Sequence, residues 1–338
     1  MIHTGTMAAL VGTLMTTARL LGAQSFPGVG EVERLDPALA SLIAPGAKIE
    51  KLADGFDWAE GPAWRKRGGY LLFSDAPRNT IYKWKEGQGI SVFLRPAGFT
   101  TPNPPGRELG SNGLAFDAHD TLVMADHGNR QIARLNEGQY TKTTLAARHE
   151  GKRFNSPNDL AIRSNGDIYF TDPPFGLEGL NNDPAKEIPY SGVYRLKPSG
   201  EVTLLTRELA FPNGIAFSPD EKTLYVSNTE ANRAVWMAYD VRADGTIAQG
   251  RVLFDASALA RAGRKGLPDG LRVDTKGNLF AAGPGGILVI SPAGKHLGTI
   301  ITGQPTANCA FGDDGSTLYM AANNSLMRIK LTTKGVGF

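Results

Sequence analysis

The stretch Asn158-Asp-Leu-Ala-Ile-Arg-Ser-Asn-Gly-Asp-Ile-Tyr-Phe170 carries the pattern that decides the fold. It opens with a polar residue and continues as a short apolar strand. Ser164-Asn165-Gly166-Asp167 then makes a turn, and a second apolar strand follows. Two short strands joined by a turn of this composition predict a β-hairpin. The chain is therefore expected to be built from hairpins and not from long helices.

The same unit recurs six times along the chain. Its polar first residues, called the head residues here, are Glu60, Asn112, Asn158, Asn213, Asp269 and Asn308, and they are 39 to 56 residues apart. This spacing agrees with the roughly 40 to 50 residues of a four-stranded propeller blade plus insertions. We therefore predict an all-β fold, a six-bladed β-propeller with four-stranded blades. The alternative is a parallel β-helix, which lacks the hairpin turns that dominate this sequence.

One outer strand is missing from the repeat. Fourth strands are expected at Ser91–Leu94, Thr143–Ala146, Val202–Thr206, Arg251–Phe254 and His296–Ile301, so only five serve six units. Lys48–Leu52 precedes the first unit and is predicted to be the outermost strand of the last blade, which closes the ring. The propeller domain is accordingly expected over residues 46–338, after a lead-in segment at 24–45.

Residues 1–23 resemble a secretory signal, because an apolar stretch from Met7 ends in small residues. This predicts a periplasmic or secreted protein; a disordered or helical extension of a cytoplasmic protein is the alternative. Arg19 interrupts the stretch, which is too short to span a bilayer. We therefore expect no integral membrane segment.

Composition excludes several other classes of protein. The formal net charge is +3 in 338 residues, and the basic residues are scattered, so nucleic acid is not an expected partner. Cys309 is the only cysteine, which excludes an intrachain disulfide and a thiolate zinc cluster. Gly-x-Ser-x-Gly and His-Glu-x-x-His motifs do not occur, which argues against a serine hydrolase and a zincin. We therefore expect a small-molecule partner. The protein itself is expected to be a monomer or a dimer.

The first strands of a propeller line its central channel, so the six head residues are expected to converge at one end of it. Two carboxylates and four amides are costly to bury without a donor or a cation. Calcium takes six to eight oxygen ligands of these kinds, so one divalent ion, calcium before zinc, magnesium or manganese, is the expected cofactor. Each head residue considered alone could instead be a turn-forming residue at the start of a strand.

The phrases at the head residues resemble the SMP-30/gluconolactonase/LRE-like family, from about Leu52 to Leu331. They include Glu60-Gly-Pro-Ala-Trp, Ser156-Pro-Asn-Asp-Leu, Pro212-Asn-Gly-Ile-Ala-Phe-Ser-Pro-Asp and Leu267-Pro-Asp-Gly-Leu. Gly166-Asp-Ile-Tyr-Phe-Thr-Asp-Pro-Pro-Phe-Gly-Leu is most similar to the bacterial gluconolactonase branch. The resemblance implies a propeller with one catalytic divalent ion held by Glu60, Asn158, Asn213 and Asp269.

The resemblance also implies an activity, hydrolysis of a sugar lactone. Polarisation of the carbonyl by the ion and attack of a water activated by the ion or by Asp269 would open the ring, so Glu60 and Asp269 are the expected catalytic residues. Hydrolysis of other lactones, esters or organophosphates is the first alternative. A non-catalytic propeller in which the ion only pins the channel is the second.

Four residues are candidates for substrate binding. Asn112 shares the register of the ligands, and His127 follows a second strand on the same face. Arg107 and Arg153 lie in neighbouring connections. Two long connections, Arg95–Ser111 and Pro173–Ser191, open on this face, and Pro173–Ser191 is expected to cover the ion. A loop that packs only on itself is the alternative.

Overall fold

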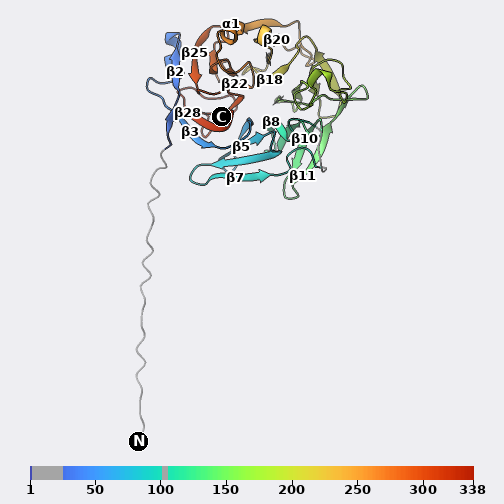
Figure 1. Ribbon diagram of the computed structural model, residues 1–338, viewed down its shortest axis with the longest axis horizontal. Helices are drawn as coiled ribbons and strands as arrows, with labels where there is room; N and C mark the ends of the chain where they lie inside the picture. The colour runs from blue at the N-terminus through green and yellow to red at the C-terminus, as the bar shows by residue number, and fades with distance from the viewer. Residues whose placement is uncertain (2–25, 101–105) are drawn as a thin grey trace.

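Six antiparallel sheets surround a central axis in the computed structural model, which describes residues 1, 26–100 and 106–338 (Figure 1). The first strand of each sheet lies nearest the axis, as β8, β18 and β22 show, while β7, β11 and β25 lie toward the outside. The predicted all-β, six-bladed propeller is confirmed. The expected leader at residues 1–23 lies, apart from Met1, outside the described residues.

Each blade is a meander whose four main strands pair in the following order. Blade one contains β4 (Ala59–Arg65), β5 (Tyr70–Asp75), β6 (Thr80–Lys85) and β7 (Gly89–Leu94). Blade two contains β8 (Ser111–Phe116), β9 (Leu122–Asp126), β10 (Gln131–Asn136) and β11 (Thr141–Ala146). Blade three contains β14 (Leu160–Ile162), β15 (Ile168–Asp172), β16 (Gly192–Leu196) and β17 (Val202–Thr206). Blade four contains β18 (Pro212–Phe217), β19 (Thr223–Asn228), β20 (Val235–Asp240) and β21 (Arg251–Asp255).

The last two blades take up the N-terminal strands. Blade five contains β22 (Leu271–Val273), β23 (Leu279–Gly283), β24 (Gly286–Ile290) and β25 (His296–Ile301), with β2 (Glu31–Arg34) added outside. Blade six contains β26 (Asn308–Gly312), β27 (Thr317–Ala322), β28 (Ser325–Lys330) and β3 (Ile49–Asp54), with β1 (Gly28–Val29) added outside. A small hairpin of β12 (Arg148–His149) and β13 (Lys152–Arg153) follows blade two.

An N-terminal strand closes the ring, as predicted. β3 pairs with β28 from Ser325 opposite Asp54 to Ile329 opposite Ile49. The prediction that Lys48–Leu52 is the outermost strand is wrong, because β1 pairs with the outer edge of β3. The segment that contains β1 and β2 covers two strand edges that would otherwise be open to pairing with another chain.

Apolar side chains between neighbouring blades form the core. Between blades five and six, Phe280, Phe311 and Met320 are among the buried residues of one such cluster. Cys309 is fully buried in the same cluster, and its thiol donates to the carbonyl oxygen of Phe280 at 3.2 Å. The Cys309 side chain thus takes part in the packing between these two blades.

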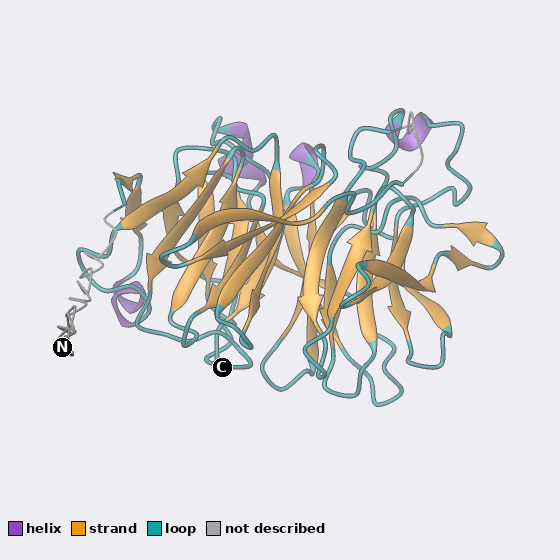
Figure 2. Cartoon of the chain, turned by 90° about the horizontal axis from the view of Figure 1, so that it is seen from below, coloured by secondary structure: helices purple, strands orange, loops and turns teal. Residues whose placement is uncertain are grey.

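The two faces of the disc differ (Figure 2). One face, called the head face, carries longer connections with the short helices η2 (Leu180–Asn182), η3 (Ala231–Arg233) and α1 (Ser257–Arg261). The opposite face, called the tail face, carries tight hairpin turns and the C-terminus; η1 (Pro37–Ser41) lies in the lead-in segment. Among the residues that the structure describes, no helix has the length and apolarity needed to cross a bilayer.

Candidate metal and substrate site

The six head residues come together at the head-face end of the channel, where the first strands begin. Glu60, Asn112 and Asn213 are the second residues of β4, β8 and β18, and Asn308 begins β26. Asn158 and Asp269 stand two residues before β14 and β22. All six are buried except Asp269, which is partly exposed. The side of the ring that carries Asp269 is therefore the side open to solvent.

Glycines that follow the head residues explain how six strands fit around one axis. A Cβ on Gly61 would lie 1.9 Å from the carbonyl oxygen of Asn112, and one on Gly270 would lie 2.0 Å from Cγ of Asn308. No side chain fits at such distances, so glycine is required for neighbouring first strands to approach each other. The pairs Glu60-Gly61 and Asp269-Gly270 thus serve close packing of the first strands at the axis. The alternative interpretation, that head residues only form turns at strand entries, would place these pairs in isolated turns.

The amide head residues form a chain of hydrogen bonds along one side of the ring. Nδ2 of Asn112 donates to Oδ1 of Asn158 at 3.1 Å, and Nδ2 of Asn158 donates to Oδ1 of Asn213 at 2.6 Å. Nδ2 of Asn213 donates to the Thr229 hydroxyl at 3.0 Å, which donates in turn to the carbonyl oxygen of Pro268 at 2.6 Å. The chain fixes the orientation of three amide planes.

The other side of the ring concentrates carboxylates. Oε2 of Glu60 accepts from the amide of Gly61 at 3.0 Å and from Nδ2 of Asn308 at 3.4 Å. Nδ2 of Asn308 also lies 3.5 Å from Oδ2 of the buried Asp159. The Asn308 amide therefore presents its nitrogen to two carboxylates and stabilises them as a donor. It is not oriented as a cation ligand.

Burial disfavours the charged forms of these carboxylates. It raises the pKa of Glu60 to about 8, with smaller contributions from the negative charges of Glu108 and Asp159. Burial, followed by repulsion from Glu60, also raises the pKa of Asp269 well above its usual value. Two neighbouring acids in this state are stabilised as carboxylates when a cation lies between them.

The available donors fit a hard cation. Oδ1 of Asn112 is buried and has no hydrogen-bond partner within the described part of the chain. It thus joins the carboxylates of Glu60 and Asp269 as an oxygen with unused acceptor capacity. Among residues 26–100 and 106–338 no group of three or more His, Cys, Asp or Glu side chains could hold a metal by itself, and the head residues include neither His nor Cys, so carboxylate oxygens together with amide oxygens are the donors at hand. This oxygen set matches calcium better than zinc.

His127 contacts the ring, and a neighbour that the sequence did not point to accompanies it. Its Nε2 lies 3.1 Å from Oδ1 of Asn158, and its Nδ1 lies 2.8 Å from Oε2 of Glu108. The imidazole therefore lies against a carboxylate, although these last two atoms have no hydrogen-bond partner among the described residues. Sequence reasoning missed Glu108 because it precedes the repeat unit and shares no register with the head residues.

The two arginines proposed as substrate contacts are placed differently. Arg107 is exposed and forms no ion pair within the described residues. Arg153 donates through Nη2 to the carbonyl oxygen of Asn129 at 3.1 Å, and its own amide donates to Oε2 of Glu187 at 2.7 Å. The structure therefore brings Asn112 and His127 to the ring through hydrogen bonds, and the two arginines through none.

The long connection Pro173–Ser191 lies on the head face beside the ring. The hydroxyl of Ser156 donates to the carbonyl oxygen of Pro173 at 2.6 Å and accepts from the amide of Gly176 at 2.9 Å. Phe175 stacks on Phe211 with 5.6 Å between ring centroids. Because Ser156 and Phe211 each stand two residues before a head residue, this loop borders the site directly. The other long connection, Arg95–Ser111, includes residues 101–105, which lie outside the described residues.

Known proteins resemble this chain over most of its length. A family model described as the SMP-30/Gluconolactonase/LRE-like region matches residues 58–324. The gluconolactonase of Zymomonas mobilis is 39% identical over 97% of this chain and 95% of its own length. Regucalcin of Xenopus laevis is 27% identical over 81% of this chain and 86% of its own.

A solved structure shares the whole architecture. The structure of a gluconolactonase from Xanthomonas campestris matches with a TM-score of 0.79 and 32% identity, and the match covers 93% of this chain and all of that one. The family match spans the strands from the first head residue to the last. The chain therefore belongs to the SMP-30/gluconolactonase/LRE-like family.

Proposed function

We propose that this protein is a metal-dependent hydrolase that opens a sugar lactone. The observation that carries the proposal is the ring of carboxylate and amide oxygens at the open end of the channel, in a chain 39% identical to a gluconolactonase. A second gluconolactonase, of known structure, supports the same enzyme class. A scaffold that only binds partners needs no buried carboxylates whose ionisation is disfavoured in this way.

Glu60, Asn158, Asn213 and Asp269 would hold the divalent ion, with calcium the first choice. The free Oδ1 of Asn112 is a further donor for it or for a substrate hydroxyl. When bound, the ion supplies Lewis-acid polarisation of the lactone carbonyl and stabilises the negative charge that develops on its oxygen. Oδ1 of Asn158 already accepts from Asn112 and His127, so it would release one of these donors on ion binding.

Asp269 is the best-placed proton acceptor of the ring. Its Oδ1 accepts from the amide of Gly270 at 3.0 Å, and no other described residue donates to its Oδ2. It is also the head residue that solvent reaches. Oδ2 can therefore take the proton of the attacking water, and later pass it to the ring oxygen that leaves.

Selectivity for a sugar is attributed to the border of the site. His127 and Asn112 can orient hydroxyl groups, since each presents a polar atom next to Asn158. The stacked rings of Phe175 and Phe211 offer an apolar surface at the same border. A polyhydroxylated ring with apolar C–H faces is the substrate that uses both.

A substrate panel tests the proposal. Glucono-1,5-lactone, a simple aliphatic lactone, an aryl ester and an organophosphate triester are compared by kcat/KM, each corrected for spontaneous hydrolysis. We expect the sugar lactone to rank first and Asp269→Asn to lower its kcat/KM by about 100-fold or more, the scale of losing a stabilising group at the reacting centre. Asp244→Asn, at an exposed turn of blade four, is the matched control. A triester ranked first, or full activity of Asp269→Asn, contradicts the proposal.

A further inference from the structure

The channel has a second chamber at its other end. A cavity of about 700 Å³ opens there on the tail face and is lined by residues from the first strand of every blade. The last residues of the chain, Val336 to Phe338, form part of its wall and are exposed, as are Lys66 and Arg67 at the rim. The head residues do not line it. Solvent therefore reaches this cavity from the face opposite the ring.

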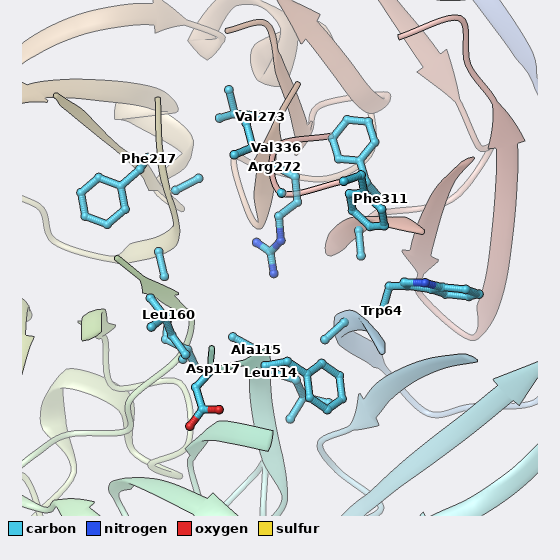
Figure 3. A pocket seen from close by; sticks show the side chains of 18 of the residues that line it. Trp64, Leu114, Ala115, Asp117, Leu160, Phe217, Arg272, Val273, Phe311 and Val336 are labelled. Carbon is cyan, nitrogen blue, oxygen red and sulfur yellow. The ribbon is translucent and has the colours of Figure 1, made fainter. Parts of the chain in front are cut away.

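Arg272 is the polar centre of the cavity. Figure 3 shows its guanidinium extending into the open space, with Leu160, Phe217 and Phe311 around it. It stands three residues beyond Asp269, which places its Cα roughly 10 Å farther along the channel at the usual rise of a strand. The two chambers are thus separate but lie on one axis.

The Arg272 guanidinium is only partly satisfied. Nη1 donates to the carbonyl oxygen of Leu271 at 2.7 Å, and the nearest carboxylate oxygen, Oδ2 of Asp159, is 3.5 Å away. A guanidinium carries five N–H donors in a planar fork. Most of the donor capacity of Arg272 faces the cavity.

The acidic residues of the cavity wall are already paired with arginines outside it. Asp117 pairs with Arg134 at 3.3 Å, Asp120 with Arg65 at 2.8 Å and Glu221 with Arg163 at 3.3 Å. Lys66 binds the carbonyl oxygen of Gly337 and covers the ring of Phe338. The acidic residues of the wall are therefore neutralised from outside the cavity, while the free N–H donors of Arg272 face its interior, which favours an anion.

The walls define the rest of the ligand. Apart from the charged residues already named, the lining is mostly apolar, with Leu114, Leu160, Ile215, Phe217, Val273 and Phe311 among its side chains. A planar carboxylate matches the guanidinium fork with two parallel hydrogen bonds. A doubly charged phosphate would carry a second charge into an apolar chamber at a large desolvation cost. We propose that this cavity binds a small organic carboxylate with an apolar body, and that Arg272 recognises the carboxylate.

Isothermal titration calorimetry on the full chain tests the proposal. The probe is 4-phenylbutyrate, compared with the neutral 4-phenylbutanamide and with phenylphosphonate. We expect the carboxylate to bind best. Arg272→Gln should weaken its binding by about 10-fold to 100-fold, the scale of one charge-assisted interaction, and leave the weak binding of the amide unchanged.

Two further variants locate the binding. Ala115→Phe fills the cavity while leaving Arg272 in place, so it should weaken the binding of 4-phenylbutyrate. It provides the test if Arg272→Gln proves unstable. Asp269→Asn alters only the ring and should bind 4-phenylbutyrate like the wild type, so the outcome is independent of the proposed lactone hydrolysis. Equal binding of acid and amide, tighter binding of the phosphonate, no measurable binding, full binding by Ala115→Phe, or loss of binding in Asp269→Asn would each overturn the proposal.

Discussion

Replacing Glu60 by glutamine should make the metal-free protein more stable, because it removes a carboxyl group that must take up a proton on folding and keeps the size of the side chain. Burial raises the pKa of Glu60 from 4.5 to about 8. The unfolded chain loses this proton above 4.5 and the folded chain only above about 8, so folding takes up a proton between these values. Stability supplied by the protonated form is therefore lost progressively as the pH rises through this window.

The size of the effect follows from the pH at which it is measured. Each pH unit above the pKa of Glu60 in the unfolded chain lowers the free energy of unfolding by about 1.4 kcal/mol, so the loss reaches about 3 kcal/mol at pH 7. Glu60→Gln has no such cost, so in chelator its free energy of unfolding should exceed that of the wild type by up to about 3 kcal/mol at pH 7 and by almost nothing at pH 4.5.

Calcium should reverse the order of stability. A ligand that binds only the folded state adds about 4 kcal/mol to the free energy of unfolding when its concentration is a thousand times its Kd. Only the wild type keeps both carboxylates for calcium. Urea unfolding at several pH values, with chelator and with excess calcium, measures both effects. Glu201→Gln, at an exposed turn of blade three, is the control and should show neither. A Glu60→Gln protein that is less stable than the wild type in chelator at pH 7, or that gains as much from calcium, would refute the reasoning.

Two predictions concern the border and the closure of the propeller. Replacing residues 177–187 by a short Gly-Ser linker should change the ranking of lactones by kcat/KM and leave calcium affinity intact, because the loop borders the ring without supplying a head residue; an unchanged ranking would assign the loop to packing alone. Deleting residues 1–54 removes β1, β2 and β3 and bares the edges of blades five and six, so this protein should aggregate in size-exclusion chromatography, whereas deletion of residues 1–25 should not. A soluble, monomeric and active 55–338 protein would contradict the closure argument.

The repeat unit made the fold predictable from the sequence. A polar head, an apolar strand and a turn recur in every blade, with Asn-Gly and Lys-Gly among the turn sequences, and such hairpins can bury their apolar faces only by packing on neighbours. The order of the strands and the closing role of β3 follow from counting outer strands. The positions of β1 and β2 could not be foreseen, because short edge strands are specified by the edges they meet and not by a pattern of their own.

The candidate site was predictable only where the repeat places residues in register. The six head residues share one position in the unit, so their convergence follows from the architecture, and His127 follows from its place after a second strand. Glu108 escapes this reasoning because it lies in a connection outside the repeat unit, and the partly satisfied Arg272 escapes it because the carboxylate beside it comes from a blade distant in sequence. The donor role of Asn308 likewise depends on the carboxylates of Glu60 and Asp159 that face it, which no local pattern records.

The most direct test of the account is the dependence of lactone hydrolysis on the bound ion. The purified protein is stripped with chelator, its metal content is measured by elemental analysis, and kcat/KM for glucono-1,5-lactone is determined before stripping, after it, and after calcium is returned. We expect activity to disappear with the metal and to return in proportion to the calcium bound, at about one ion per chain. Full lactonase activity in protein shown to be free of metal would contradict the central claim.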